Sequence, residues 1–473
     1  MQISTLSLEA AARERWDVVI AGTSFSAMFF AHGLSPGLRV LFIEKGRHYS
    51  HDEWLGEHPS LGESFAESKA STQAKVWVAN TLFGGNSNCW FGQSPRMHPS
   101  DFRLRSLYGV GTDWPFDYNR IEPYYTEVED LMEVAGGGSD GHLPRSRPFP
   151  FPPHRPSDTD FRLRAERGDI WHAVPSARSN GGSRPICCVN GICSTCPIDA
   201  KFTILNGLPR LAPALTASLV LETEVRAVDL AGGQANGVMV RGRDGRESFI
   251  AADVVALATN AIFNVAILMR SGHAAESLGR YLHEQGSLSL SIDIGHPNYF
   301  GGTSITGHCY GFYDGPHRAE RAAVLVENFN VPAVLRADPG RWTERMLIKL
   351  IAEDLPNPEN RVLLGETGEP ELVWKGHDDY MYRGIARARE RLSEILPFPL
   401  ERIVSEDATD NEAHIQGAHR MGTDPVISVV DPGQRVHGVA NLLALGAGSF
   451  PSCSPANPTL TLSALALMSG RML

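Results

Sequence analysis

Residues 16–44 read WDVVIAGTSFSAMFFAHGLSPGLRVLFIE, and this stretch decides the fold class. Residues 18–20 form a short apolar run that is typical of a buried parallel strand. Gly22 breaks that run, residues 26–34 predict a helix, and residues 38–43 predict a second strand. A strand, a helix and a parallel strand within about 30 residues make a βαβ unit. We therefore expect an α/β fold.

The turn inside this unit reads GTSFSA, residues 22–27, and predicts a dinucleotide site. Such a turn places a pyrophosphate at a helix N-terminus, where free backbone N–H groups and the helix dipole favour an anion. Of the glycines in the usual pattern only the first, Gly22, is present, and the small residues Ser24 and Ala27 replace the others. Glu44 ends the second strand, where an acid would bind ribose hydroxyls. The alternative is an ordinary strand–turn–helix.

Length and charge limit the function classes. The chain has 473 residues, which suggests about three domain-sized units. Its formal net charge of -11 argues against a nucleic-acid partner, because phosphate binding needs a basic surface. The sequence has no run of about 18 apolar residues, so we expect no transmembrane helix. The N-terminal residues lack the pattern of a signal peptide, so we expect a cytoplasmic protein, with periplasmic export beside a signal-bearing partner left open.

Two segments near the C-terminus carry a resemblance to a known family. Residues 414–422 read HIQGAHRMG and residues 456–461 read ANPTLT. They resemble the C-terminal signature of the glucose-methanol-choline (GMC) oxidoreductases, with the closest likeness to the pyranose oxidase and FAD-dependent sugar dehydrogenase branch. Four other segments agree in order: DVVIAGTSFSA (17–27), GGNSNCW (84–90), DWPFDYNRIEPYY (113–125) and PNPENRV (356–362).

The resemblance implies a two-domain flavoprotein. A Rossmann-like FAD domain would gather residues 1–105, 185–280 and 405–473. Residues 106–184 and 281–404 would form a substrate domain with a mostly antiparallel sheet. The implied reaction is hydride transfer from an alcohol carbon of a sugar or polyol to flavin N5, with a dehydrogenase expected rather than an oxidase. A non-sugar alcohol oxidase of the same superfamily and an inactive flavin-binding subunit are the alternatives.

The resemblance also implies site residues. His414 would be the base, because imidazole titrates near neutral pH, and Asn457 would hydrogen-bond the substrate oxygen. Pyranose oxidases carry a flavin-linked histidine where this chain has Cys89, so we expect non-covalent FAD. The expected cofactor-binding residues are Gly22, Ser24, Phe25, Ser26, Glu44, Gly85, Asn86, Asn88, Cys89, Val225, Gly446, Ala447, Pro458 and Thr459.

Four of the seven cysteines lie within ten residues: Cys187, Cys188, Cys193 and Cys196. In a large chain without a secretion signal, such a cluster favours a metal site over a disulfide framework. The segment is similar to the cluster-binding segment of bacterial FAD sugar dehydrogenases, which implies an iron–sulfur relay to an electron carrier or small subunit. A zinc site and a loop whose thiols only pack or form one disulfide are the alternatives.

Overall fold

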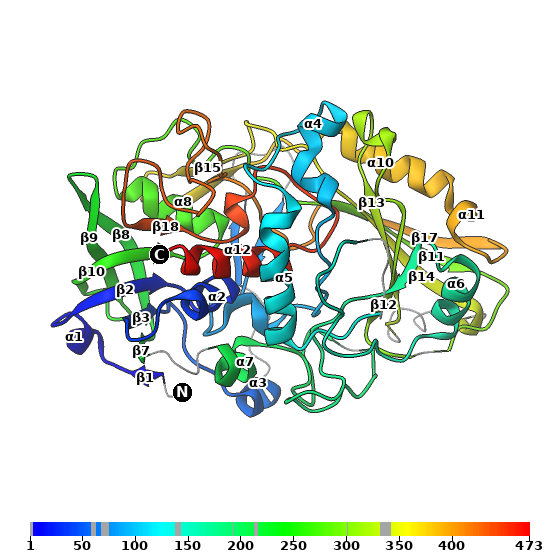
Figure 1. Ribbon diagram of the computed structural model, residues 1–473, viewed down its shortest axis with the longest axis horizontal. Helices are drawn as coiled ribbons and strands as arrows, with labels where there is room; N and C mark the ends of the chain where they lie inside the picture. Colours follow the sequence, from blue (N-terminus) through cyan, green and yellow to red (C-terminus); the bar gives the residue numbers. More distant parts are fainter. Residues whose placement is uncertain are drawn as a thin grey trace.

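The computed structural model describes residues 3–57, 63–67, 75–137, 143–191, 193–211, 216–299, 301–331 and 342–473. Most strands belong to two large sheets, which lie toward opposite ends of the molecule (Figure 1). The first sheet has the order β1-β7-β3-β2-β10-β9-β8, with β18 beside β10. Its strands are β1 (Ser4–Thr5), β2 (Arg15–Ala21), β3 (Arg39–Ile43), β7 (Thr216–Val220), β8 (Thr223–Ala231), β9 (Gln234–Gly242), β10 (Glu247–Leu257) and β18 (Leu442–Ala444).

The centre of the first sheet is parallel and confirms the α/β prediction. β2 pairs in parallel with both β3 and β10, and β18 pairs in parallel with β10. Helix α2 (Phe25–Gly33) makes the crossover from β2 to β3. The long helix α12 (Thr459–Arg471) packs against α2, although the two lie at opposite ends of the chain (Figure 1). The approach is close: a Cβ on Gly470 would lie 2.2 Å from the Phe30 carbonyl oxygen.

The second sheet has the order β17-β11-β14-β13-β12-β6, and all its pairs are antiparallel, as expected. Its strands are β6 (Trp171–Ala173), β11 (Gly286–Asp293), β12 (Ile305–Phe312), β13 (Val324–Phe329), β14 (Arg345–Ala352) and β17 (Arg402–Thr409). Helices α10 (Asp379–Glu390) and α11 (Leu392–Ile395) share an apolar core with one face of this sheet. The domain boundary expected at residue 405 falls inside β17.

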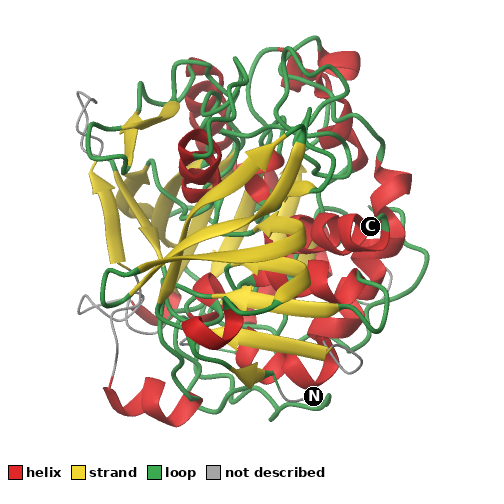
Figure 2. Ribbon diagram, turned by 90° about the vertical axis from the view of Figure 1, so that its left-hand side faces the viewer, coloured by secondary structure: helices red, strands yellow, loops and turns green. Residues whose placement is uncertain are grey.

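The remaining elements are shorter or lie around the two sheets. They are α1 (Leu8–Ala11), α3 (His51–Glu57), β4 (Glu63–Glu67), β5 (Val76–Ala79), η1 (Gly85–Asn88), η2 (Pro99–Arg103), α4 (Leu104–Tyr108), α5 (Tyr118–Met132), α6 (Asp158–Arg167), α7 (Ile204–Leu211), α8 (Ala261–Arg270), η3 (Pro316–Ala319), η4 (Trp342–Glu344), β15 (Arg361–Leu364), β16 (Pro370–Val373) and η5 (Ala447–Ser449). Figure 2 shows strands gathered through the interior, with the helix that ends at the C-terminus packed beside them. In the described part of the chain, no helix is long and apolar enough to cross a membrane.

Candidate active site

A cavity of about 590 Å³ is lined by residues of both sheets. Its volume is in the range of small-molecule and cofactor sites. The first sheet contributes the carboxyl ends of β2 and β3, and the second contributes side chains of β12, β13 and β14. The N-termini of α2 and α12 also line it, through Phe25 and Thr459. A long ligand can therefore contact both sheets at once.

At the β2–β3 end, the backbone leaves no room for a side chain at position 22 of the turn. Gly22 has a φ of +95°, and a Cβ there would lie 2.7 Å from the Ala258 carbonyl oxygen. The Thr23 hydroxyl donates to Glu44 over 2.5 Å and accepts from the Gly84 backbone N–H over 2.9 Å. Burial raises the pKa of Glu44 to about 7, so this carboxyl gains from polar groups of a ligand, such as ribose hydroxyls. Thr23 thus joins the turn, the acid and the loop that follows β5.

That loop explains how the turn works with one glycine of the usual three. A Cβ on Gly85 would lie 2.8 Å from the Ser24 Cβ, so glycine in the loop makes room for serine in the turn. Ser24 caps α2 without a side-chain hydrogen bond, which leaves the first N–H groups of the helix available to an anion. Pro458 likewise caps α12 without one. Two helix N-termini therefore face one cavity, a geometry that suits a ligand with anionic groups.

The structure brings nearly all the expected cofactor-binding residues to this cavity. Those that line it are Gly22, Ser24, Phe25, Ser26, Glu44, Gly85, Asn86, Cys89, Val225, Gly446, Ala447, Pro458 and Thr459. Asn88 does not line it: its side-chain amide donates to the Phe83 carbonyl oxygen over 3.0 Å and so braces the loop from behind. Both expected catalytic residues, His414 and Asn457, line the cavity.

The hydrogen bonds of Gln285 fix the protonation pattern of His414. The Gln285 side-chain nitrogen donates to two backbone carbonyls, those of Ser454 at 2.6 Å and Ala456 at 3.0 Å. Its oxygen therefore faces His414 Nδ1, 2.6 Å away, and can only accept. Nδ1 must therefore carry the hydrogen, and Nε2 has none and can accept a proton. Burial and the positive charge of Lys349 lower the pKa of His414 to about 3, so the imidazole is neutral at physiological pH.

The backbone that carries His414 is held in a conformation uncommon for a residue with a side chain. Ala413 has a φ of +57°. Side-chain oxygens accept from three consecutive N–H groups: Glu284 binds those of Glu412 and His414 at 2.6 and 3.2 Å, and Asn411 binds that of Ala413 at 2.8 Å. Because the surroundings satisfy each donor, the strained turn persists and orients the imidazole.

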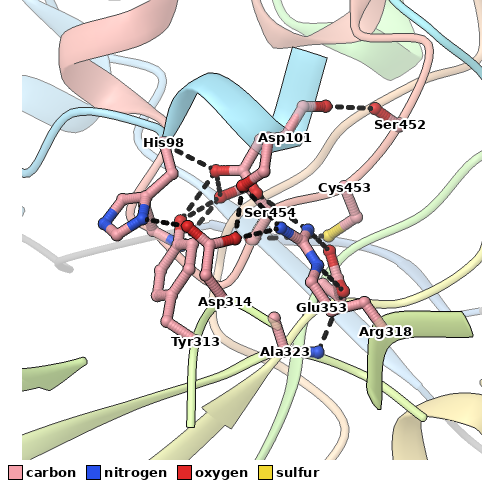
Figure 3. Close-up of polar contacts among 12 residues, drawn as sticks. His98, Asp101, Tyr313, Asp314, Arg318, Ala323, Glu353, Ser452, Cys453 and Ser454 are labelled. Carbon is pink, nitrogen blue, oxygen red and sulfur yellow. Dashed lines mark hydrogen bonds and ion pairs between the residues drawn. The ribbon is translucent and has the colours of Figure 1, made fainter. Parts of the chain in front are cut away.

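A buried polar network supports the segment that precedes Asn457 (Figure 3). The Arg318 guanidinium is fully buried and contacts the carboxylates of Asp101 at 2.8 Å and Glu353 at 2.5 Å. Asp101 in turn accepts from the Ser454 hydroxyl over 3.0 Å. The Ser454 carbonyl is one of the two that orient Gln285. The network therefore fixes the backbone that positions Gln285, while the Asn457 side-chain oxygen, which also lines the cavity, makes no hydrogen bond within the described structure.

The described residues give no support to the metal site expected at the cysteine segment. Cys193 and Cys196 are buried, Cys187 is half-buried and Cys188 is exposed. Across the residues that the structure describes, no group of three or more His, Cys, Asp or Glu side chains is placed to hold a metal ion. The Cys193 sulfur instead accepts from the Ser304 N–H over 3.2 Å. The expected iron–sulfur cluster therefore stays a prediction from sequence spacing.

Residues 357–466 match the sequence profile described as GMC oxidoreductase. The chain thus resembles the GMC oxidoreductases in its C-terminal part. Among its relatives, the fructose dehydrogenase large subunit of Gluconobacter japonicus is 26% identical, over 95% of this chain and 96% of that protein. The 6'''-hydroxyparomomycin C oxidase of Streptomyces lividus is 29% identical over 96% of this chain and 91% of that one, and the paromamine 6'-oxidase of Streptomyces fradiae is 28% identical over the same shares.

Solved structures share the fold of this chain. Pyridoxine 4-oxidase from Mesorbium loti superposes with a TM-score of 0.71 at 19% identity, over 97% of this chain and 99% of that one. A formate oxidase superposes with a TM-score of 0.67 at 13% identity, over 100% and 98%. The expected family and fold class are confirmed. The GMC oxidoreductase match supports an FAD-dependent enzyme that acts on CH–OH donors.

Several residues of the candidate site could not be assigned from the sequence motifs. Gln285, Glu284 and Lys349 come from segments outside every motif, and Glu327 lies on β13. One signal was present: Glu327 and Lys349 are charged residues inside the apolar runs VLVENF and RMLIKLIA. Charged residues are rarely buried in a strand unless they are paired or functional.

Proposed function

We propose that this enzyme oxidises an alcohol carbon of a sugar or glycoside to a carbonyl, with His414 as the base and Asn457 binding the substrate oxygen. The observation that carries the proposal is the neutral imidazole of His414, whose Nε2 has no hydrogen. This imidazole lines the cavity that the N-termini of α2 and α12 also line. Relatives named for fructose and for paromomycin-type glycosides support the substrate class. Residues 1–105, 185–280 and 405–473 would form the FAD domain, and residues 106–184 and 281–404 the substrate domain.

The chain's own residues perform the proton chemistry. Nε2 of His414 takes the hydroxyl proton as the carbon loses a hydride, and the Asn457 amide holds the oxygen on which negative charge develops. Bound FAD supplies the hydride acceptor. The N-terminus of α12 lines the same cavity and favours negative charge there. Burial raises the pKa of the Cys89 thiol, so it stays protonated and unreactive, which supports non-covalent FAD.

Changing Gln285 tests how the base is held. In the unaltered enzyme, the rate of flavin reduction by substrate should stay flat as pH falls to about 5, because His414 has a pKa near 3. Gln285→Glu places a carboxylate beside Nδ1 and favours the imidazolium, so the pKa rises and the rate should fall on the acid side. Gln285→Leu should slow reduction roughly 10- to 100-fold, since nothing then fixes the tautomer. Rapid-mixing absorbance across pH measures both.

The matched control is Gln234→Glu, which makes the same charge change at an exposed position. Its pH profile should equal that of the unaltered enzyme. An unchanged, flat profile in Gln285→Glu with full FAD content would remove Gln285 from the mechanism and make its contact with His414 structural.

We propose that the electrons then pass to a carrier protein or small subunit rather than to oxygen, on the likeness to the fructose dehydrogenase large subunit. Reduced enzyme should be reoxidised faster by ferricyanide than by air-saturated buffer. Peroxide formed as fast as substrate is oxidised would make the protein an oxidase. Iron and acid-labile sulfide in stoichiometric amounts would restore the cluster assignment to the cysteine segment.

A further inference from the structure

Within the described residues, the charged side chains that line the cavity pair with an opposite charge or accept hydrogen bonds, except for one carboxylate. They are Glu44, Lys45, Glu224, Glu327, Lys349 and Glu412. At the end near β2 and β3, Lys45 lies 3.8 Å from Glu224, and Glu44 is bonded by the Thr23 hydroxyl and the Gly46 N–H. Near His414, the Lys349 ammonium lies 2.5 Å from Glu412. This leaves Glu327.

Glu327 faces the cavity from β13 with 2% of its surface exposed, and its Oε1 makes no hydrogen bond within the described structure. Strand register places it opposite Lys349, but that ammonium is bonded to Glu412. One lysine therefore stands beside two carboxylates, and burial raises the pKa of Glu412, to which Glu327 contributes by repulsion. This part of the cavity wall, formed by Glu327, Lys349 and Glu412, thus has one more carboxylate than it has lysines.

The neighbour of Glu327 on the other side does not balance it. His308 Nε2 lies 3.3 Å from Glu327 Oε1, yet neither ring nitrogen of His308 forms a hydrogen bond in the described part of the chain. A protonated His308 would leave its Nδ1 N–H buried without an acceptor, which is costly. A neutral imidazole leaves the carboxylate charge uncompensated. A buried carboxylate without a cation is strongly unfavourable, so a ligand that supplies one gains the difference.

We propose that the substrate carries a protonated amine and that Glu327 binds it: the enzyme acts on an amino sugar or amino glycoside. This inference rests on the proposed function and names its substrate class. The hydroxyl that is oxidised would lie at His414, while the ammonium of the same molecule would lie at Glu327; both residues line the cavity. Glu327 is then a specificity-determining residue, separate from the proton transfer.

The test uses oxidised, FAD-loaded enzyme under anaerobic conditions. Methyl glucosides with an amine at C-2, C-3 or C-6 are each titrated against methyl glucoside, and binding is followed by the change in flavin absorbance. At least one amine should bind about 30-fold or more tighter than the neutral sugar, the size expected for a buried charge pair. Glu327→Gln should bring the two within about threefold. Lys349→Met, which frees the second carboxylate, should increase the preference.

Glu406→Gln is the matched control, because this exposed carboxylate on β17 lies outside the cavity, and its preference should equal that of the unaltered enzyme. If Glu327→Gln fails to hold FAD, Lys349→Met and the unaltered enzyme decide the matter. The inference is overturned if no amine binds tighter than methyl glucoside or if Glu327→Gln keeps the preference. Glu327-dependent binding without flavin reduction would instead contradict the proposed alcohol oxidation and leave the cation site standing.

Discussion

His414→Ala should slow flavin reduction by substrate about 10²- to 10⁴-fold while the protein keeps its FAD. The loss has this size because the imidazole is neutral and its Nε2 is bare, so no other change is needed before it accepts the proton. FAD should remain because the cavity is lined mainly by other segments, from the β2 turn to the start of α12. Single-turnover mixing of enzyme with substrate, under anaerobic conditions, gives the reduction rate directly.

The control for this substitution is His437→Ala. His437 is half-buried, hydrogen-bonds the Ser428 hydroxyl over 3.0 Å and does not line the cavity, so its removal should leave the reduction rate within about twofold. A His414→Ala enzyme that reduces its flavin at a near-normal rate would show that the proton leaves by another route.

Gly22→Ala should abolish or severely weaken FAD binding. At φ +95° a residue with a Cβ is strained by roughly 1–2 kcal/mol. Here the Cβ would also lie 2.7 Å from the carbonyl oxygen of Ala258, which lines the cavity directly after β10. The turn must move to relieve that contact, and it carries Thr23 and the start of α2 with it. We expect affinity for FAD to fall by at least about tenfold to a hundredfold, measured by flavin release on dilution.

Gly37→Ala separates strain from displacement. Gly37 has nearly the same φ, +94°, but a Cβ there meets nothing within 4 Å. This variant should lose about 1 kcal/mol of stability and keep its FAD. Equal FAD content in the two variants would mean that the turn tolerates a side chain and that the cofactor does not depend on its close approach.

The sequence predicted those parts of the fold that depend on local pattern. The helix predicted over residues 26–34 and the strand predicted over 38–43 match α2 and β3 within one residue, and β2 extends three residues before the apolar run at 18–20. Residues 84–103 contain two short 3-10 helices, η1 and η2, and the Asp101 N–H donates to the His98 carbonyl oxygen in the second of them. Helix α10 ends at Glu390 and α11 begins at Leu392, so the helical segment is interrupted at Arg391. Such short turns and breaks depend on local hydrogen bonds that apolar patterning does not indicate.

The residues that hold His414 in place could not be predicted, because they act through contacts between segments that are distant in the sequence. Gln285 reaches His414 across 129 positions and Ser454 across 169. Nothing in the local pattern of either residue indicates that pairing. The cysteines show the opposite case: their spacing resembles a ligand set, but loop geometry decides whether sulfur atoms converge, and spacing does not fix it.

The contact between α2 and α12 has a consequence for biosynthesis. Residues 25–31 of α2 are all buried, and α12, which lies across them, leaves the ribosome after roughly 430 further residues, roughly 20–90 seconds later at ordinary rates of synthesis. Until then this apolar helix lacks its cover and the cavity lacks one of its two helix N-termini. The complete cavity therefore forms only after α12 has been translated, and until then the apolar face of α2 lacks its main helical packing partner.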